Sequence, residues 1–350
     1  MSAKEARAVK ARDERTPKAL GVSDQDLLQM YYFVRLARAV DERMWALQRS
    51  GQAAFVISGQ GHEGAQVGVV SALDREKDWL VPFYRSVAAV LVKGMPPAEI
   101  FLIQLSKATD PSSGGRQMPG HYGHSGHKIL STSSPVTTQL LHADGIAYAA
   151  KVRRTGEICV TEVGEGSTSE GDFHEALNFA AIHKLGVVFV VENNGYAISV
   201  PVAKQMAVPN VSARAVGYGM PGVTVDGSHV LEVYAAAREA VARARRGEGP
   251  TLLEVKVPRL TAHSSDDRQE KYRSADEIAH TKEQDSVHVF TEELRAWGVL
   301  SEAREAEIAD RVRRDVDLGT EIAEAAPVVD PATATRYVYY EHDTPPGRGR

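Results

Sequence analysis

The sequence predicts an α/β protein in which a parallel sheet carries helices on both faces. Two observations support this: short β-branched segments alternate with longer amphipathic ones, and two of the apolar segments end in polar, glycine-rich stretches. Such an alternation is typical of parallel strands joined by covering helices. The expected strands are EICVTEV (157–163), VVFVVENN (187–194), VTVDG (223–227) and TLLEVKV (251–257), with helices at 170–186 and 230–247.

The flanking segments complete one domain. Apolar residues at helical spacing predict helices at 24–50, from about His62, after Pro135, and at the periphery over 275–325, while 78–85 has the pattern of a short strand. Residues 106–135 are rich in Gly, Ser, His and Pro, which is typical of a functional loop. We therefore expect a flexible N-terminal arm (1–22), a single α/β domain (23–325) and an extended C-terminal tail (326–350).

Composition narrows the class of protein. The chain has 350 residues, 25% of them charged, and a formal net charge of -5, which does not favour a nucleic-acid partner. Its single cysteine, Cys159, excludes an intramolecular disulfide framework and suits a reducing compartment. No apolar run is long enough for a membrane span, and the charged N-terminus does not resemble a secretory signal. The expected location is the cytoplasm.

The polar stretches after two strands, GEGSTSEGD (164–172) and ENNGYAIS (192–199), are the strongest functional signal. If these strands are neighbours, Glu165 and Asn194 meet at the carboxyl edge of the sheet, where ligands bind in such folds. Their oxygens and the Tyr196 carbonyl suit Mg²⁺, and the helix that begins near Ser169 suits a phosphate group. Each stretch alone is also compatible with an ordinary turn or a capped helix start. Neither a P-loop nor a dinucleotide fingerprint fits these residues.

The spacing of the two stretches resembles the thiamine-diphosphate motif, with Glu165 in place of the usual aspartate. From about 41 to 273, the order of GRQMPGHYG, SSPVTTQ, GEGSTSEGD, NNGYAIS, VDG and HSSDD…YRS is similar to that in the alpha subunit of the branched-chain 2-oxo acid dehydrogenase decarboxylase. RQMPGHYG favours the branched-chain branch over the pyruvate branch. The resemblance implies a thiamine-diphosphate-binding fold and decarboxylation of a 2-oxo acid.

The resemblance also implies roles for individual residues. His263 and His121 would be catalytic, and Glu165, Asn194 and the Tyr196 carbonyl would bind Mg²⁺. The implied cofactor-binding residues are Phe83, Tyr84, Arg85, Ser134, Pro135, Val136, Gly164, Glu165, Gly166, Ser167, Asn194, Tyr196, Ala197, Ile198 and His263. Phe55, Tyr84, Met118, His121 and Ser134 would line the substrate pocket. Ser133, Pro135, Thr138 and Gln139 match a K⁺ loop of the animal enzymes.

The implied partners are a beta subunit, in an assembly of two alpha and two beta chains, and the lipoyl-bearing acyltransferase that accepts the acyl group. The beta subunit would supply the carboxylate that activates the cofactor. Two departures from the animal pattern stand out: Glu192 replaces an arginine, and a shortened loop makes phosphorylation of Ser264 doubtful. Pyruvate or acetoin dehydrogenase remains an alternative, as does a non-catalytic Mg-diphosphate binding module, whereas a nicotinamide-dependent oxidoreductase is disfavoured.

Three histidines in HYGHSGHK, at positions 121, 124 and 127, raise the question of a zinc site. No cysteine or well-placed carboxylate completes a ligand set, and the intervening glycines leave it loose. The sequence therefore predicts a polar loop without metal at this place.

Overall fold

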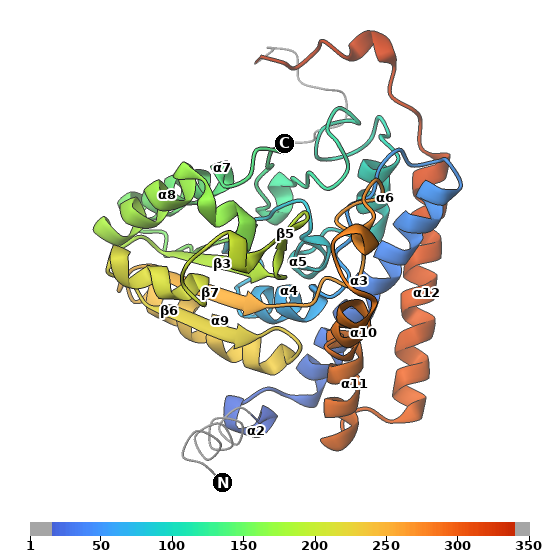
Figure 1. Ribbon diagram of the computed structural model, residues 1–350. Helices are drawn as coiled ribbons and strands as arrows, with labels where there is room; N and C mark the ends of the chain where they lie inside the picture. The colour runs from blue at the N-terminus through green and yellow to red at the C-terminus, as the bar shows by residue number, and fades with distance from the viewer. Residues whose placement is uncertain (1–15, 340–350) are drawn as a thin grey trace.

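A parallel sheet forms the centre of the protein, as the sequence predicts. The computed structural model describes residues 16–339. Within them, the main sheet has the order β1-β2-β3-β7-β6, and all its pairings are parallel (Figure 1). Its strands are β1 (Trp79–Val81), β2 (Cys159–Gly164), β3 (Val187–Asn193), β7 (Thr251–Lys256) and β6 (Gly222–Asp226). A short antiparallel pair, β4 (Tyr196–Ala197) and β5 (Val200–Pro201), follows β3.

Helices cover both faces of the sheet, because successive strand residues point to opposite sides. Val188 and Val190 of β3 pack in one apolar cluster, whereas Val187 and Phe189 pack in another. The first cluster includes α4 (Glu63–Val70), α5 (Val87–Lys93) and α9 (Val230–Arg245). The second includes α7 (Thr138–Arg153) and α8 (Gly171–Ile182), which lie on the other side in Figure 1.

A group of outer helices packs beside this layered core. The long helices α3 (Asp24–Arg49) and α12 (Glu302–Ala325) lie side by side at one end of the sheet (Figure 1). An ion pair of 2.6 Å between Arg43 and Asp317 joins them. The remaining outer helices are α6 (Pro97–Gln104), α10 (Ala275–Glu283) and α11 (Ser286–Ala296). In the described residues, none of the helices combines the length and the apolar character needed to cross a bilayer.

The sequence did not anticipate α5 and α6. All seven residues of α5 are buried, so the segment lacks the alternation of apolar and polar residues that marks an amphipathic helix. Within the predicted N-terminal arm, Pro17–Leu20 form the short helix α2, and residues 1–15 lie outside the described part. The predicted tail contains a single 3-10 turn, Pro331–Thr333, before the description ends at 339.

One buried carboxyl group in α7 makes stability depend on pH. Both side-chain oxygens of Asp144 are buried and have no hydrogen-bond partner among residues 16–339. Burial raises the pKa of Asp144 to about 8. The folded state prefers the protonated form of Asp144. The contribution of this group to the free energy of unfolding is therefore complete below the unfolded-state pKa of about 4, and it is lost as the pH rises to about 8.

We expect Asp144→Asn to be more stable than the wild type by a margin that widens between about pH 4 and pH 8. The difference in free energy of unfolding between the two proteins can grow by at most ~1.4 kcal/mol for each pH unit in this range. Urea unfolding at pH 5 and at pH 8 measures the margin, with the exposed Asp310→Asn in α12 as the control. Equal margins at both pH values would show that Asp144 ionises normally in the folded chain.

Candidate active site

The tips of β2 and β3 lie together at the carboxyl edge of the sheet. The two strands are parallel neighbours, and their register pairs Gly164 with Glu192. Just beyond these residues, the backbone N–H of Asn194 donates a hydrogen bond of 3.2 Å to Oε2 of Glu165. The structure thus brings together the two residues that the sequence singled out, although they are far apart along the chain.

The loop after β3 packs closely on the turn after β2. The N–H of Tyr196 donates to Oδ1 of Asn194 at 3.1 Å, which closes a tight turn. Gly166 lies so close to Ala197 that a Cβ atom on it would be 2.5 Å from the Cβ of Ala197. Only glycine therefore permits this approach, which holds the two loops in one arrangement.

Glu165 has the properties of a metal ligand. Its side chain is buried, and its Oε1 atom has no hydrogen-bond partner within the described part of the chain. Burial raises the pKa of this carboxyl group, and the N–H of Asn194 partly opposes the rise. A divalent cation would satisfy the unpaired oxygen and favour the ionised form. The carboxylate, the amide of Asn194 and nearby carbonyl groups are the hard oxygen ligands that Mg²⁺ prefers. These residues fit such an ion.

Arg85, after β1, contributes a buried positive charge. Its Nη1 atom donates to the Ser58 carbonyl at 2.5 Å, and its Nη2 atom to Nδ1 of His263 at 3.1 Å. The Tyr84 ring lies edge-on to the His263 ring, with centroids 6.2 Å apart. No carboxylate within residues 16–339 forms an ion pair with Arg85. A buried guanidinium without a carboxylate partner is costly unless an anion binds to it.

A second buried guanidinium, Arg259, was not found by sequence reasoning. It follows β7, donates to the Ile198 carbonyl at 2.9 Å and to the Tyr272 hydroxyl at 2.7 Å, and forms no ion pair within the described ranges. Burial lowers the pKa of Arg259, and so does the charge of Arg85. The sequence feature that could have identified Arg259 is its position just beyond β7, a strand of the same sheet. The two guanidinium groups together indicate a binding site for an anion.

His263 is neutral at pH 7. Burial, Arg85 and Arg259 lower its pKa to about 4. Because Arg85 donates to Nδ1, the ring hydrogen is placed on Nε2, which can donate to a ligand. The loop around His263 is held by a 2.8 Å bond from its N–H to Asp267 and by a 2.9 Å bond from the Ser265 N–H to the Val56 carbonyl.

The expected substrate residues lie on three segments around this edge. His121 donates from Nδ1 to the Met118 carbonyl at 2.8 Å, and its Nε2 atom accepts from the Ser134 hydroxyl at 2.9 Å. Gly120 packs against the Tyr84 backbone, so this loop lies beside the Arg85 segment. The Met118 side chain is 53% exposed. Phe55 is partly buried, and its carbonyl accepts from Gln104 of α6.

The expected K⁺ loop is only partly assembled. Thr138 donates to the Pro135 carbonyl at 3.2 Å, and its hydroxyl lies 3.2 Å from that of Ser133. The Gln139 side chain instead donates to the Glu162 carbonyl of β2 at 3.2 Å, and its Oε1 atom has no partner among the described residues.

The other residues expected to bind the cofactor differ in exposure. Phe83 and Ser167 are buried, Gly164 and Val136 are partly exposed, and Ile198 is 55% exposed.

Glu192 does not face the open edge of the sheet. Its side chain is fully buried, lies 2.5 Å from Nδ1 of His62, and accepts from Gln66 of α4 at 3.0 Å. Burial raises the pKa of Glu192 to about 8 and lowers that of His62 well below its ordinary value. Burial thus favours the uncharged form of each partner.

Comparison with known proteins shows the family. Residues 31–332 match the family described as Dehydrogenase E1 component. The chain is 51% identical to 2-oxoisovalerate dehydrogenase subunit alpha of Bacillus subtilis over 322 residues, which are 92% of this chain and 98% of that protein.

Two further relatives extend this comparison. Identity is 38% to 3-methyl-2-oxobutanoate dehydrogenase subunit alpha of Mycobacterium tuberculosis, over 83% of this chain and 76% of the relative. Identity is 34% to pyruvate dehydrogenase E1 component subunit alpha of Staphylococcus aureus, over 84% of this chain and 77% of that relative. The joined strand tips, the two unpaired guanidinium groups and these similarities lead to one conclusion: the chain belongs to the dehydrogenase E1 component family.

Proposed function

We propose that this chain is the alpha subunit of a branched-chain 2-oxo acid dehydrogenase. It would decarboxylate a 2-oxo acid with thiamine diphosphate and pass the acyl group to the lipoyl group of an acyltransferase. The observation that carries this proposal is the junction of Glu165 and Asn194, where a buried carboxylate oxygen lacks a partner. The names of the relatives that are 51% and 38% identical support the branched-chain substrate.

Different residues at the sheet edge would bind the metal and the diphosphate. Glu165, Asn194 and the Tyr196 carbonyl would hold Mg²⁺, while Arg85 and Arg259 would neutralise the diphosphate. The backbone of Gly164, Gly166 and Ser167 would lie close to the diphosphate. Thiamine diphosphate, when bound, supplies an electron sink for the negative charge that loss of carbon dioxide leaves. We also propose K⁺ at Ser133, Pro135 and Thr138, where Gln139 would have to reorient to take part.

The two histidines would act on the substrate side. His263 presents an Nε2–H donor, because Arg85 occupies Nδ1, and it can stabilise a developing oxyanion without changing its charge. His121 is held at both ring nitrogens by Met118 and Ser134. Ser134 is exposed beside it, so a 2-oxo acid that displaces the serine hydroxyl would meet the Nε2 atom of His121.

We further propose that a beta subunit completes the site, in an assembly of two alpha and two beta chains in the cytoplasm. The free, buried Cys159 suits a reducing compartment. A carboxylate that bonds the aminopyrimidine would have to come from the partner, because Glu162 and Glu192 are buried within the sheet. Glu162 accepts from Ser86 at 2.6 Å, and Glu192 contacts His62 and Gln66.

Calorimetric titration of thiamine diphosphate, with the chain co-purified with its beta subunit, tests the cofactor site. We expect Asn194→Ala to weaken binding by about tenfold or more in the presence of Mg²⁺, because a metal ligand is lost. In the absence of Mg²⁺ the variant should differ little from the wild type. Asn178→Ala, on the exposed side of α8, is the matched control. Unchanged affinity and unchanged Mg²⁺ dependence in Asn194→Ala would show that Asn194 is not a ligand.

A further inference from the structure

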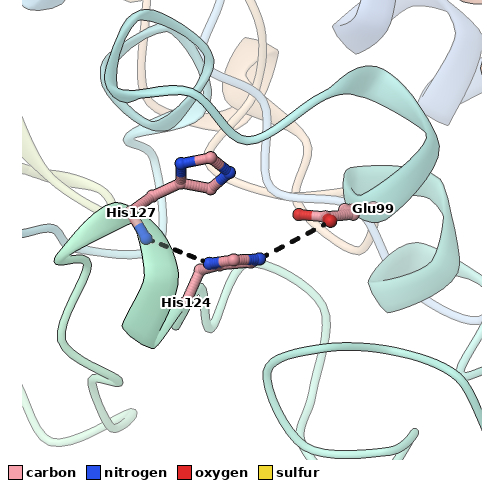
Figure 2. A group of neighbouring side chains, drawn as sticks. All are labelled: Glu99, His124 and His127. Carbon is pink, nitrogen blue, oxygen red and sulfur yellow. Dashed lines mark hydrogen bonds and ion pairs between the residues drawn. The ribbon is translucent and has the colours of Figure 1, made fainter. Parts of the chain in front are cut away.

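A cluster of two histidines and a glutamate lies outside the candidate active site. Glu99, His124 and His127 each place a potential ligand atom within 4.8 Å of the others, and no further group of this kind occurs within residues 16–339. Figure 2 shows the two imidazole rings and the carboxylate turned toward one another. The rings of His124 and His127 have centroids 4.2 Å apart. Helix α6 thus supplies the carboxylate that the histidine segment itself lacks.

The backbone brings these side chains together from two parts of the chain. Glu99 lies in the first turn of α6, whereas His124 precedes the 3-10 turn Ser125–His127 and His127 is its last residue. This turn is joined to the edge strand β1 by two isolated β-bridges, one between His124 and Ile129 and one between Ile129 and Leu80. Because both parts are anchored to regular structure, the cluster is not a chance contact between loose loops.

Two glycines leave the space that the rings occupy. A Cβ atom on Gly94, which has a left-handed φ of 125°, would lie 2.8 Å from Nδ1 of His127. A Cβ atom on Gly126 would lie 3.0 Å from the His124 ring. A side chain at either position would displace an imidazole, so the ring positions depend on these glycines.

The polar atoms of the cluster are poorly satisfied. Oε2 of Glu99 is buried and has no hydrogen-bond partner within the described chain. Oε1 of Glu99 lies 3.6 Å from Nε2 of His124, which is too long for a good hydrogen bond. The His127 ring forms no hydrogen bond with any residue in 16–339. A buried carboxylate oxygen without a partner indicates a missing cation or donor.

The surrounding charges favour a metal that binds imidazole nitrogen over a hard alkaline-earth ion. Lys93 and Arg75 place two positive charges near the His127 ring. The Lys93 ammonium group is held by the Arg75 carbonyl. Two nearby cations disfavour Ca²⁺ or Mg²⁺, which rely on charge alone, whereas imidazole and carboxylate together suit Zn²⁺.

We propose that Glu99, His124 and His127 form a binding site for a transition-metal dication of the Zn²⁺ class, with water as the fourth ligand. Small side-chain rotations would bring the three ligand atoms to the ~2 Å bonds that Zn²⁺ requires. Binding at Nε2 of His124 moves the ring hydrogen to Nδ1. This gives up the 3.2 Å hydrogen bond from the His127 N–H.

The position of the site assigns it a structural role. His124 follows His121 in the loop over 106–135, and His121 in turn bonds Ser134. A metal bound to Glu99 and the two histidines would tie this loop to α6. The inference does not rest on the proposed function, because neither Mg²⁺ nor thiamine diphosphate enters it.

Zinc titration of the full chain, co-purified with its beta subunit, tests the site. Excess Mg²⁺ keeps the oxygen site at Glu165 filled, and a chelating dye reports free Zn²⁺. We expect the wild type to bind one more Zn²⁺ per alpha chain than His127→Gln, and Glu99→Gln to weaken that binding by about tenfold or more. His280→Gln in α10, which removes an exposed histidine paired only with Glu283, is the matched control and should bind as the wild type does.

Thermal unfolding and cobalt spectroscopy give readouts that do not depend on activity. Zn²⁺ should raise the melting temperature of the wild type and of His280→Gln, but not that of Glu99→Gln, since only a folded-state site stabilises. Co²⁺ bound to the wild type should show the strong visible absorption of a four-coordinate site. Equal zinc content and equal melting shifts in the wild type, Glu99→Gln and His127→Gln would overturn the proposal. So would the absence of zinc binding to the wild type.

Discussion

The chain purified without a second subunit is expected to show no measurable decarboxylation of 2-oxo acids. Co-expression with its beta subunit should restore turnover, with 3-methyl-2-oxobutanoate converted faster than pyruvate. The physical reason is the lack of a suitable carboxylate at the edge of this sheet. Glu165 is the proposed metal ligand, and Glu162 and Glu192 are buried beside Ser86, His62 and Gln66. We therefore expect the carboxylate that activates the cofactor to come from the beta subunit.

The measurement is release of carbon dioxide with an artificial electron acceptor, for the single chain and for the co-purified pair. A binding titration of thiamine diphosphate on the same samples separates loss of binding from loss of chemistry. Substantial turnover by the single chain would disprove the shared site. If the pair binds thiamine diphosphate with Mg²⁺ but never turns over, the chain is a non-catalytic binding module. Faster turnover of pyruvate than of the branched acid would assign the substrate to the pyruvate branch.

Replacement of His263 by alanine should lower acyl transfer to the lipoyl acceptor by about 100-fold, the size of a lost proton donor in catalysis. Decarboxylation measured with an artificial acceptor should survive. The neutral ring offers an Nε2–H donor because Arg85 holds Nδ1, and alanine removes that donor while the buried Arg85 keeps its bond to Ser58. Rates with lipoylated acceptor and with an artificial acceptor, measured on the same preparation, test this separation.

Two comparisons make the His263 result decisive. His288→Ala, at an exposed position in α11, should leave both rates unchanged. Thiamine diphosphate affinity of His263→Ala should stay close to that of the wild type, because in the proposed site the metal and the guanidinium groups bind the diphosphate. A loss of the same size in both assays, together with weakened binding, would instead identify His263 as a cofactor-binding residue.

Much of the fold followed from local patterns. The alternation of β-branched and amphipathic segments predicted β2, β3, β6 and β7 and the helices between them, because parallel strands buried on both faces are continuously apolar. The polar stretches after β2 and β3 likewise marked the edge at which Glu165 and Asn194 meet. Helices α5 and α6 were missed, since α5 is wholly buried and α6 is buried from Ile100 to Gln104, which leaves too little of a polar face to reveal the helical period.

The parts of the site that sequence reasoning missed depend on the order of strands. Arg259 reaches the site because β7 pairs with β3, although β7 lies far along the chain. Glu192 turned out to be a buried acid bonded to His62, which no pattern within ENNGYAIS could show. The histidine segment lacked a carboxylate in sequence and acquired Glu99 when α6 packed beside it.

The sequence by itself determined the strand and helix pattern, the placement of oxygen-bearing side chains after two strands, and the resemblance to the E1 alpha chains. The tertiary structure alone decided which groups share one environment: two unpaired guanidinium groups beside His263, a buried Glu192–His62 pair, and a Glu99–His124–His127 cluster. The reason is physical. Periodicity and turn chemistry act between residues a few positions apart, whereas burial, pKa and ligand geometry depend on contacts that form only when strands pair and helices pack.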